Sequence, residues 1–97
     1  MGEKNLYQLH MFVSGRVQGV GFRFYTIEKA RKYGIKGWVK NLYDGRVEIL
    51  AEGPKQNLLL FRQDIKLGPS MAYVSEISEH WEEIKSYTFD DFYIKYY

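Results

Sequence analysis

The part of this sequence best suited to chemistry is residues 14–23, SGRVQGVGFR, which hold three glycines and two arginines. Glycines permit sharp turns in which consecutive backbone N–H groups point into one concavity, and such concavities bind anions. The segment lies between a run typical of a strand, YQLHMFV, and a run typical of a helix, FYTIEKARKYG. The free N–H groups and partial positive charge at the start of that helix would face the same anion. The segment is therefore a candidate phosphate-binding loop.

Arg23 falls in the first turn of the predicted helix, where a planar guanidinium can bind two phosphate oxygens at once. Two known nucleotide loops do not match, because Phe24 stands where the third glycine of G-x-G-x-x-G belongs and no Gly-Lys-Ser/Thr follows. The loop alone leaves a second interpretation open. In it the glycines only make a tight connection, and Arg16 and Arg23 are solvated charges.

Apolar periodicity predicts the elements that position this loop. They are a strand over residues 7–14, a helix over residues 22–33, strands over residues 36–41 and 46–52, a second helix after Gly53-Pro54, and strands over residues 74–81 and 89–96. Gly34 and Gly68-Pro69 are placed to end the two helices. Between the second and third strands, Asp44-Gly45 is a strong hairpin signal, because glycine accepts the positive φ of the turn.

This order of elements predicts an α+β fold, the ferredoxin-like βαββαβ sandwich with an additional C-terminal strand. We expect two helices on one face of an antiparallel sheet, with Leu58, Phe61 and Ile65 as the apolar face of the second helix. The other face of the sheet is expected to lie toward water. Nine tyrosines suit such an open face, since tyrosine combines apolar area with a polar tip.

Together with residues 34–45, the glycine loop closely resembles the acylphosphatase family. The family's first motif, G-R-V-Q-G-V-x-F-R, is matched throughout by residues 15–23. Its second motif, G-W-V-x-N followed by a D-G turn, is matched by residues 37–41 and 44–45. The resemblance continues through Val47-Glu48, Gly53-Pro54, Gly68-Pro69-Ser70 and residues 92–96, and so covers nearly the whole chain.

The resemblance implies hydrolysis of a small-molecule acyl phosphate to a carboxylate and inorganic phosphate, without metal or cofactor. In the family the loop's backbone N–H groups hold the phosphate, and here they belong to Val17, Gln18, Gly19, Val20 and Gly21. By the same match, Arg23 binds the phosphate oxygens and Asn41 orients the attacking water. Taken alone, Asn41 is a turn residue before the hairpin, and only its pairing with the first motif gives it a catalytic role.

The implied reaction suits these residue types. The leaving group is a carboxylate, whose conjugate acid has a pKa near ~4, so the protein need not supply a strong acid. Phosphoryl transfer asks mainly for alignment and for stabilisation of charge on the phosphoryl oxygens. Asn41 is a poor base, so the attacking water is expected to lose its proton late, to the phosphate itself.

Composition limits the function further. With 97 residues the chain is expected to be one domain, residues 1–97, and the absence of cysteine excludes disulfides and thiolate metal sites. A net charge of +2 is too small to indicate a nucleic acid or an anionic membrane as partner. His10 and His80 have no metal-ligand companion at useful spacing. No leader or membrane-spanning run stands out, so we expect a cytoplasmic monomer.

Three alternatives stay open. RNA-recognition modules use a related βαββαβ arrangement, and Lys36-Gly37-Trp38 faintly resembles the start of their signature, though in the second strand rather than the third. A degenerate regulatory domain would bind an anion without turning it over. Similar acylphosphatase-like domains also occur at the start of larger carbamoyl-transferring maturation proteins; because this chain ends at Tyr97, a free-standing enzyme is expected.

Overall fold

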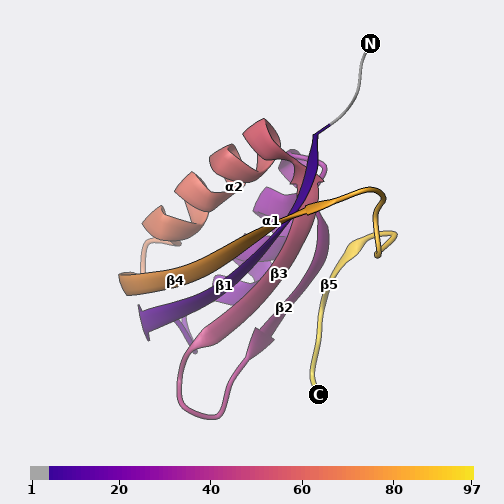
Figure 1. Cartoon of the computed structure of the whole chain (residues 1–97). Helices are drawn as coiled ribbons and strands as arrows, with labels where there is room; N and C mark the ends of the chain where they lie inside the picture. Colours follow the sequence, from indigo (N-terminus) through magenta and orange to yellow (C-terminus); the bar gives the residue numbers. More distant parts are fainter. Residues whose placement is uncertain (1–4) are drawn as a thin grey trace.

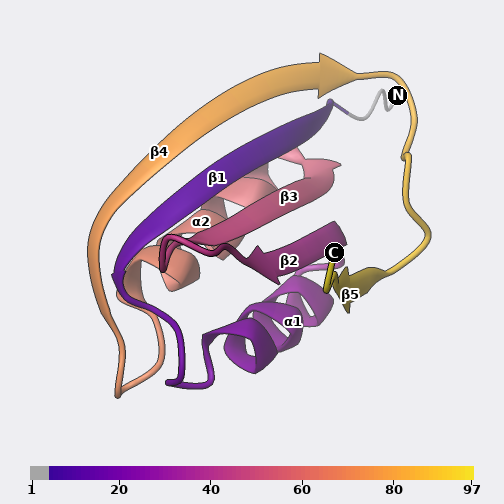
Figure 2. The ribbon, with the colours of Figure 1, turned by 90° about the horizontal axis from the view of Figure 1, so that it is seen from below.

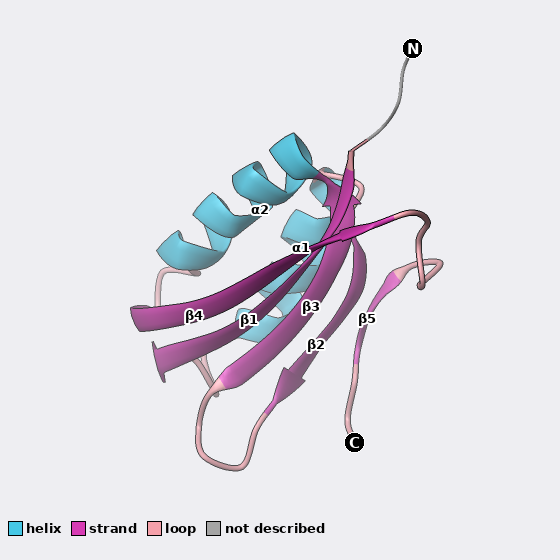
Figure 3. Cartoon of the chain, in the orientation of Figure 1, coloured by secondary structure: helices cyan, strands magenta, loops and turns pink. Residues whose placement is uncertain are grey.

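A computed structural model describes residues 5–97 and places two helices against one face of a five-stranded sheet (Figure 1). The elements along the chain are β1 (Leu6–Arg16), α1 (Phe22–Lys32), β2 (Lys36–Asn41), β3 (Val47–Pro54), α2 (Lys55–Leu67), β4 (Tyr73–Ile84) and β5 (Phe92–Ile94). Figure 3 shows both helices on the same side of the sheet. The predicted ferredoxin-like α+β fold, with its additional C-terminal strand, is confirmed.

The sheet is mixed rather than wholly antiparallel. Its strand order is β4-β1-β3-β2-β5, and β4, β1, β3 and β2 pair antiparallel as expected. The terminal strand β5 instead pairs parallel to β2. The reason is the connection after β4, which crosses the sheet end where β2 begins and so delivers β5 in the same direction as β2 (Figure 2).

The last two strands differ in length from the prediction. β4 is longer than residues 74–81, because it pairs along the whole of β1, from Leu6 opposite Ile84 to Arg16 opposite Tyr73. β5 is shorter than residues 89–96, because only three residues of β2 pair with it. Backbone hydrogen bonds from Gly37 N–H to Asp91 O and from Lys95 N–H to Val39 O, both 2.9 Å, close the two ends of this short pairing.

A bulge explains why apolar residues in β4 do not alternate strictly. Val13 lies opposite Ile77 and Gly15 lies opposite Val74, with a register shift between Ser14 and Gly15. The shift gives β4 one extra residue, so Val74 and Ile77 both pack against the core although three positions separate them. Sequence alternation alone therefore could not place both residues on one face.

The core lies between the sheet and the helices. Alternate residues of β1 and β3 are fully buried there, namely Leu9, Met11, Val13, Val47, Ile49 and Ala51. The predicted face of α2, formed by Leu58, Phe61 and Ile65, has no exposed area. The ring of Phe61 lies 6.0 Å from that of Phe92, in an edge-on contact that anchors β5 to the core. This packing holds the ends of the strands in place.

Candidate functional site

The predicted site residues converge on one cavity at the end of the sheet where β1 and β2 finish. Its volume is about 130 Å³, and its lining is Val17, Gln18, Gly19, Gly21, Phe22, Arg23, Phe24 and Asn41. Val20 is the exception among the loop residues, since its side chain packs against the core. The loop, Arg23 and Asn41 are thus neighbours in the fold although they lie apart in the sequence.

Strand directions explain this convergence. β1 and β2 both pair antiparallel with β3, so they run in the same direction. The loop follows β1 directly, and Asn41 is the last residue of β2. α1 begins at Phe22, immediately after the loop, which brings Arg23 in its first turn to the same place.

The loop offers backbone donors in an open turn. Gly19 and Gly21 have φ angles of 75° and 76°, in the left-handed region that favours glycine. Gly21 is the N-cap of α1, and as a glycine it has no side chain that could cap the free N–H groups of the helix. Within residues 5–97, no hydrogen bond uses the backbone N–H groups from Gln18 to Gly21 as donors. These N–H groups, beside the positive end of a helix, are suited to bind an anion.

The side chain of Gln18 ties the loop to the hairpin that follows Asn41. Its Nε2 donates to the backbone carbonyls of Leu42 and Arg46, each at 2.9 Å. The family motif assigns a role to the backbone N–H of this residue and does not reveal the side-chain contact. An amide side chain inside a glycine loop suggests a hydrogen-bonding role. Nothing in the sequence, however, identifies the carbonyls of Leu42 and Arg46 as its partners. Gln18 therefore fixes the spacing between the loop and the end of β2.

The geometry of Asn41 does not fit a purely structural turn residue. Its Oδ1 is buried and has no hydrogen-bond partner among the described residues. The hairpin is instead held by Asp44, whose Oδ1 accepts a 3.1 Å hydrogen bond from the backbone N–H of Arg46. This hydrogen bond is the main reason that the pKa of Asp44 is lowered. A buried polar atom without a partner lowers the stability of the fold by about 1–3 kcal/mol. Asn41 is therefore a candidate for a functional role rather than a stabilising one.

Arg23 keeps its charge available at the cavity. No carboxylate of residues 5–97 lies within ion-pair distance of its guanidinium. Its Cζ lies 5.6 Å from the ring centroid of Tyr96, which supports the side chain by a cation–π contact. Arg16 is exposed and does not line the cavity, as expected for a solvated charge.

Among residues 5–97, no carboxylate, imidazole or ammonium side chain lines the cavity. A reaction here would rest on a guanidinium, an amide and backbone N–H groups. In the described part of the chain, no three His, Cys, Asp or Glu side chains lie together so as to hold a metal ion. Neither of its two helices has the length and apolar character to cross a bilayer.

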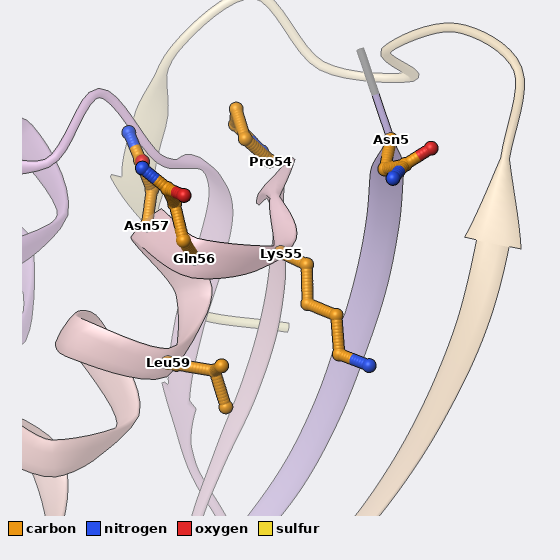
Figure 4. Close-up of a pocket in the computed structure, with 6 residues that line it drawn as sticks. All are labelled: Asn5, Pro54, Lys55, Gln56, Asn57 and Leu59. Atoms are coloured by element: carbon orange, nitrogen blue, oxygen red, sulfur yellow. The ribbon is translucent and has the colours of Figure 1, made fainter. Parts of the chain in front are cut away.

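A larger hollow at the start of α2 offers less chemistry (Figure 4). Its lining is Asn5, Pro54, Lys55, Gln56, Asn57 and Leu59. Two of its polar side chains already make intramolecular contacts. Asn57 Nδ2 donates to the backbone carbonyl of Tyr33 at 3.0 Å, and Lys55 Nζ lies 5.4 Å from the ring centroid of Tyr7. These contacts fasten the two helices and β1 together.

Two aromatic rings on the open face of the sheet, those of Phe12 and Trp38, lie against cationic side chains. Base stacking needs aromatic rings with an accessible face. Here Arg46 Cζ lies 4.9 Å from the ring centroid of Phe12, and Lys95 Nζ lies 4.5 Å from that of Trp38, which is only 7% exposed. The face also carries the carboxylate of Glu48, 2.7 Å from His10 Nε2.

The tyrosines lie mainly elsewhere. Tyr25 and Tyr33 are on α1 or at its end, Tyr43 is in the hairpin turn, and Tyr96 follows β5. The expectation that tyrosines cover the open face is therefore wrong. Tyr43 and Tyr96 lie instead at the end of the sheet that holds the cavity.

Known proteins resemble this chain over most of its length. A family profile described as acylphosphatase matches residues 9–94. The acylphosphatase of Chloroflexus aurantiacus is 48% identical over 79 residues, which are 81% of this chain and 86% of that protein. The crystal structure of an acylphosphatase from Bacillus subtilis has a TM-score of 0.88 and 43% identity, covering 93% of this chain and 99% of that one.

One further similarity concerns a much longer protein. The crystal structure of full-length HypF in a phosphate- and nucleotide-bound form has a TM-score of 0.85 and 30% identity. It covers 97% of this chain but only 12% of that one. The same fold therefore also occurs as a small part of a larger protein.

Proposed function

Because the chain belongs to the acylphosphatase family, we propose that it hydrolyses acyl phosphates to a carboxylate and inorganic phosphate at the cavity beside the glycine loop. The position of Asn41 is the main support for assigning the site to this cavity. This side chain lines the same cavity as the loop and Arg23, yet its buried Oδ1 contributes nothing to the hairpin. Both motifs of the family thus meet at one place.

In the proposed mechanism the phosphoryl group is held by positive and partially positive groups. The backbone N–H groups from Val17 to Gly21 and the guanidinium of Arg23 donate to its oxygens. Such donors stabilise the charge on the phosphoryl oxygens in the transition state, and they need no rearrangement when the reaction occurs. Gln18 keeps this loop at a fixed distance from Asn41 through its two carbonyl contacts.

The water is placed by Asn41, whose carboxamide can both donate and accept hydrogen bonds. The oxygen of the water bonds to phosphorus as the bond between phosphorus and the acyl oxygen breaks. The electron pair of that bond leaves with the carboxylate, which is stable without protonation because its conjugate acid has a pKa near ~4. No side-chain base lines the cavity, so the proton of the water passes to a phosphoryl oxygen.

Hydrolysis of benzoyl phosphate by the purified protein tests this function. We expect steady turnover that is unchanged by an excess of EDTA, since a guanidinium and backbone N–H groups supply the positive charge. Release of benzoate and phosphate in equal amounts would be followed by absorbance and a phosphate assay. A folded protein that released neither product would contradict the proposal, and single-stranded RNA would then be the next ligand to test.

Substitution of Gly19 by valine tests the loop. The φ of 75° at Gly19 strains any side chain, although a Cβ there would meet no atom within 4 Å. We expect stability to fall by about 1–2 kcal/mol and inhibition by inorganic phosphate to weaken roughly tenfold or more, because the N–H groups lose their common direction.

Gly34 provides a matched control, since it has a φ of 68° and equally open space but lies at the far end of α1. Gly34→Val is expected to lose similar stability and to keep normal phosphate inhibition. Equal phosphate inhibition in both variants would contradict the loop's role.

A further inference from the structure

A second hollow adjoins the proposed phosphate cavity. Its volume is about 200 Å³, and it is lined by Lys40, Asn41, Leu42, Tyr43, Tyr96 and Tyr97. Asn41 lines both hollows, and the ring of Tyr96 in the second contacts Arg23 in the first. In an acyl phosphate a single oxygen joins phosphorus to the acyl carbon. The acyl group must therefore lie directly beside the phosphoryl group, and this second hollow is one space that adjoins the phosphate cavity.

The parallel pairing of β5 with β2 creates this hollow. Because the two strands run in the same direction, the residues that follow each of them meet at one end of the sheet. These are Leu42 and Tyr43 after β2, and Tyr96 and Tyr97 after β5. The side chain of Lys95 holds the second pair in place, since its Nζ lies 4.5 Å from the ring centroid of Trp38 and 5.6 Å from that of Tyr97.

The lining of this hollow favours an apolar acyl group with a flat surface. Three of its residues are tyrosines, and Tyr96 and Tyr97 are 76% and 85% exposed. Exposed aromatic rings side by side are costly in water unless a ligand covers them, and they pack well against another ring. None of the described side chains that line the hollow is a carboxylate. Leu42 adds an aliphatic side chain next to Asn41.

We propose that this hollow is the acyl subsite and that it selects aromatic acyl groups over small aliphatic ones. The inference rests on the proposed function and adds a substrate class to it. Leu42 and Tyr97 are the specificity-determining residues. Tyr96 contributes to the same wall, but its contact with Arg23 also affects the phosphate cavity, so it does not serve as a test position.

Lys40 would favour a charged acyl group rather than an aromatic one. It lies in the same lining, and no carboxylate within residues 5–97 forms an ion pair with it. An acyl group with a distal carboxylate could use this charge. The hollow has one such cation among its residues and three aromatic rings, which is why the aromatic group is the proposed occupant.

The test compares kcat/KM for benzoyl, acetyl and succinyl phosphate in the wild type, Leu42→Ala and Tyr97→Ala. We expect the wild type to prefer benzoyl phosphate. Each variant should lose about tenfold in kcat/KM for benzoyl phosphate and little for acetyl phosphate, since only the larger group fills the hollow. Tyr97→Phe should keep the wild-type preference. Tyr73→Ala, which removes a similarly exposed tyrosine from β4, should change nothing.

Binding of benzoylphosphonate and acetylphosphonate, measured by calorimetry, separates this inference from the proposed function. A wild type that binds benzoylphosphonate more tightly than acetylphosphonate, but turns over no substrate, would support the acyl subsite and contradict the proposed hydrolysis. Equal losses for all substrates in the two variants would overturn the subsite. A wild-type preference for succinyl phosphate that Lys40→Met removes would also overturn it. So would a benzoyl preference lost only in Phe24→Ala, because Phe24 lines the phosphate cavity and not the second hollow.

Discussion

Replacing Arg23 by alanine is expected to abolish turnover of benzoyl phosphate while the protein keeps its fold. Among the described residues, Arg23 has the only side-chain cation that lines the proposed phosphate cavity, so its loss removes most of the charge that would stabilise the transition state. Removal of such an arginine costs roughly 10³-fold or more in rate. Stability should change little, because Arg23 is partly exposed and its removal leaves no carboxylate unpaired. Initial rates and thermal unfolding measure the two effects.

Two further substitutions sharpen this experiment. Arg23→Lys should restore little activity, because an ammonium group cannot donate to two phosphate oxygens in one plane. Arg16→Ala removes an arginine from the same motif, outside the cavity, and should cause only a small loss that disappears at high salt. A lysine variant with most of the wild-type rate would contradict the two-oxygen contact. If Arg16→Ala were as inactive as Arg23→Ala, the assignment of the phosphate contact to Arg23 would be wrong.

Replacing Asn41 by alanine should give a different pattern, in which turnover is lost and affinity for inorganic phosphate is kept. The side chain is proposed to place the water, so its removal should lower kcat by about 10²-fold or more. Inorganic phosphate is proposed to bind the loop and Arg23, which the substitution leaves intact. Stability should stay the same or rise by up to about 1 kcal/mol, because the buried Oδ1 has no partner to lose.

Asn57→Ala is the matched control for this variant. Its Nδ2 donates to the backbone carbonyl of Tyr33 at 3.0 Å, so the alanine variant should lose stability and keep its activity. Denaturant unfolding, phosphate inhibition and initial rates would be compared in the two variants. If Asn41→Ala lost phosphate affinity as completely as Arg23→Ala, the proposed water-placing role would be wrong.

Much of the fold could be predicted because the local signals agree with the packing. The apolar spacing of Leu58, Phe61 and Ile65 indicates one buried helix face, and the structure buries all three residues. Asp44-Gly45 indicates a hairpin, and the structure places these residues in the turn between β2 and β3. These predictions depend on neighbours along the chain, which the sequence displays directly.

The remaining features depend on partners far along the chain. The bulge in β4 opposite Ser14 and Gly15 depends on the register in which β4 pairs with β1. Nothing in Phe92-Tyr93-Ile94 shows which strand it joins or in which direction, since a three-residue strand carries little pattern. The second contact of Gln18 and the contact between Tyr96 and Arg23 follow from these long-range arrangements. The motifs predict that the loop, Arg23 and Asn41 belong to one site, and the structure places them around one cavity; they do not predict the contacts that surround it.

The shortness of β5 gives the two halves of the proposed site unequal local stability. The phosphate loop is continuous with β1 and α1, which lie within the main body of the sheet and its helices. Tyr96 and Tyr97 follow β5, a three-residue strand at the sheet's edge. This strand is held by β2 on one side and by the buried ring of Phe92. Edge segments of this kind open by sub-global unfolding at a lower free energy than the whole domain. Detachment of β5 would thus separate Tyr96 from Arg23 and open the proposed acyl side of the site, while the glycine loop remained folded.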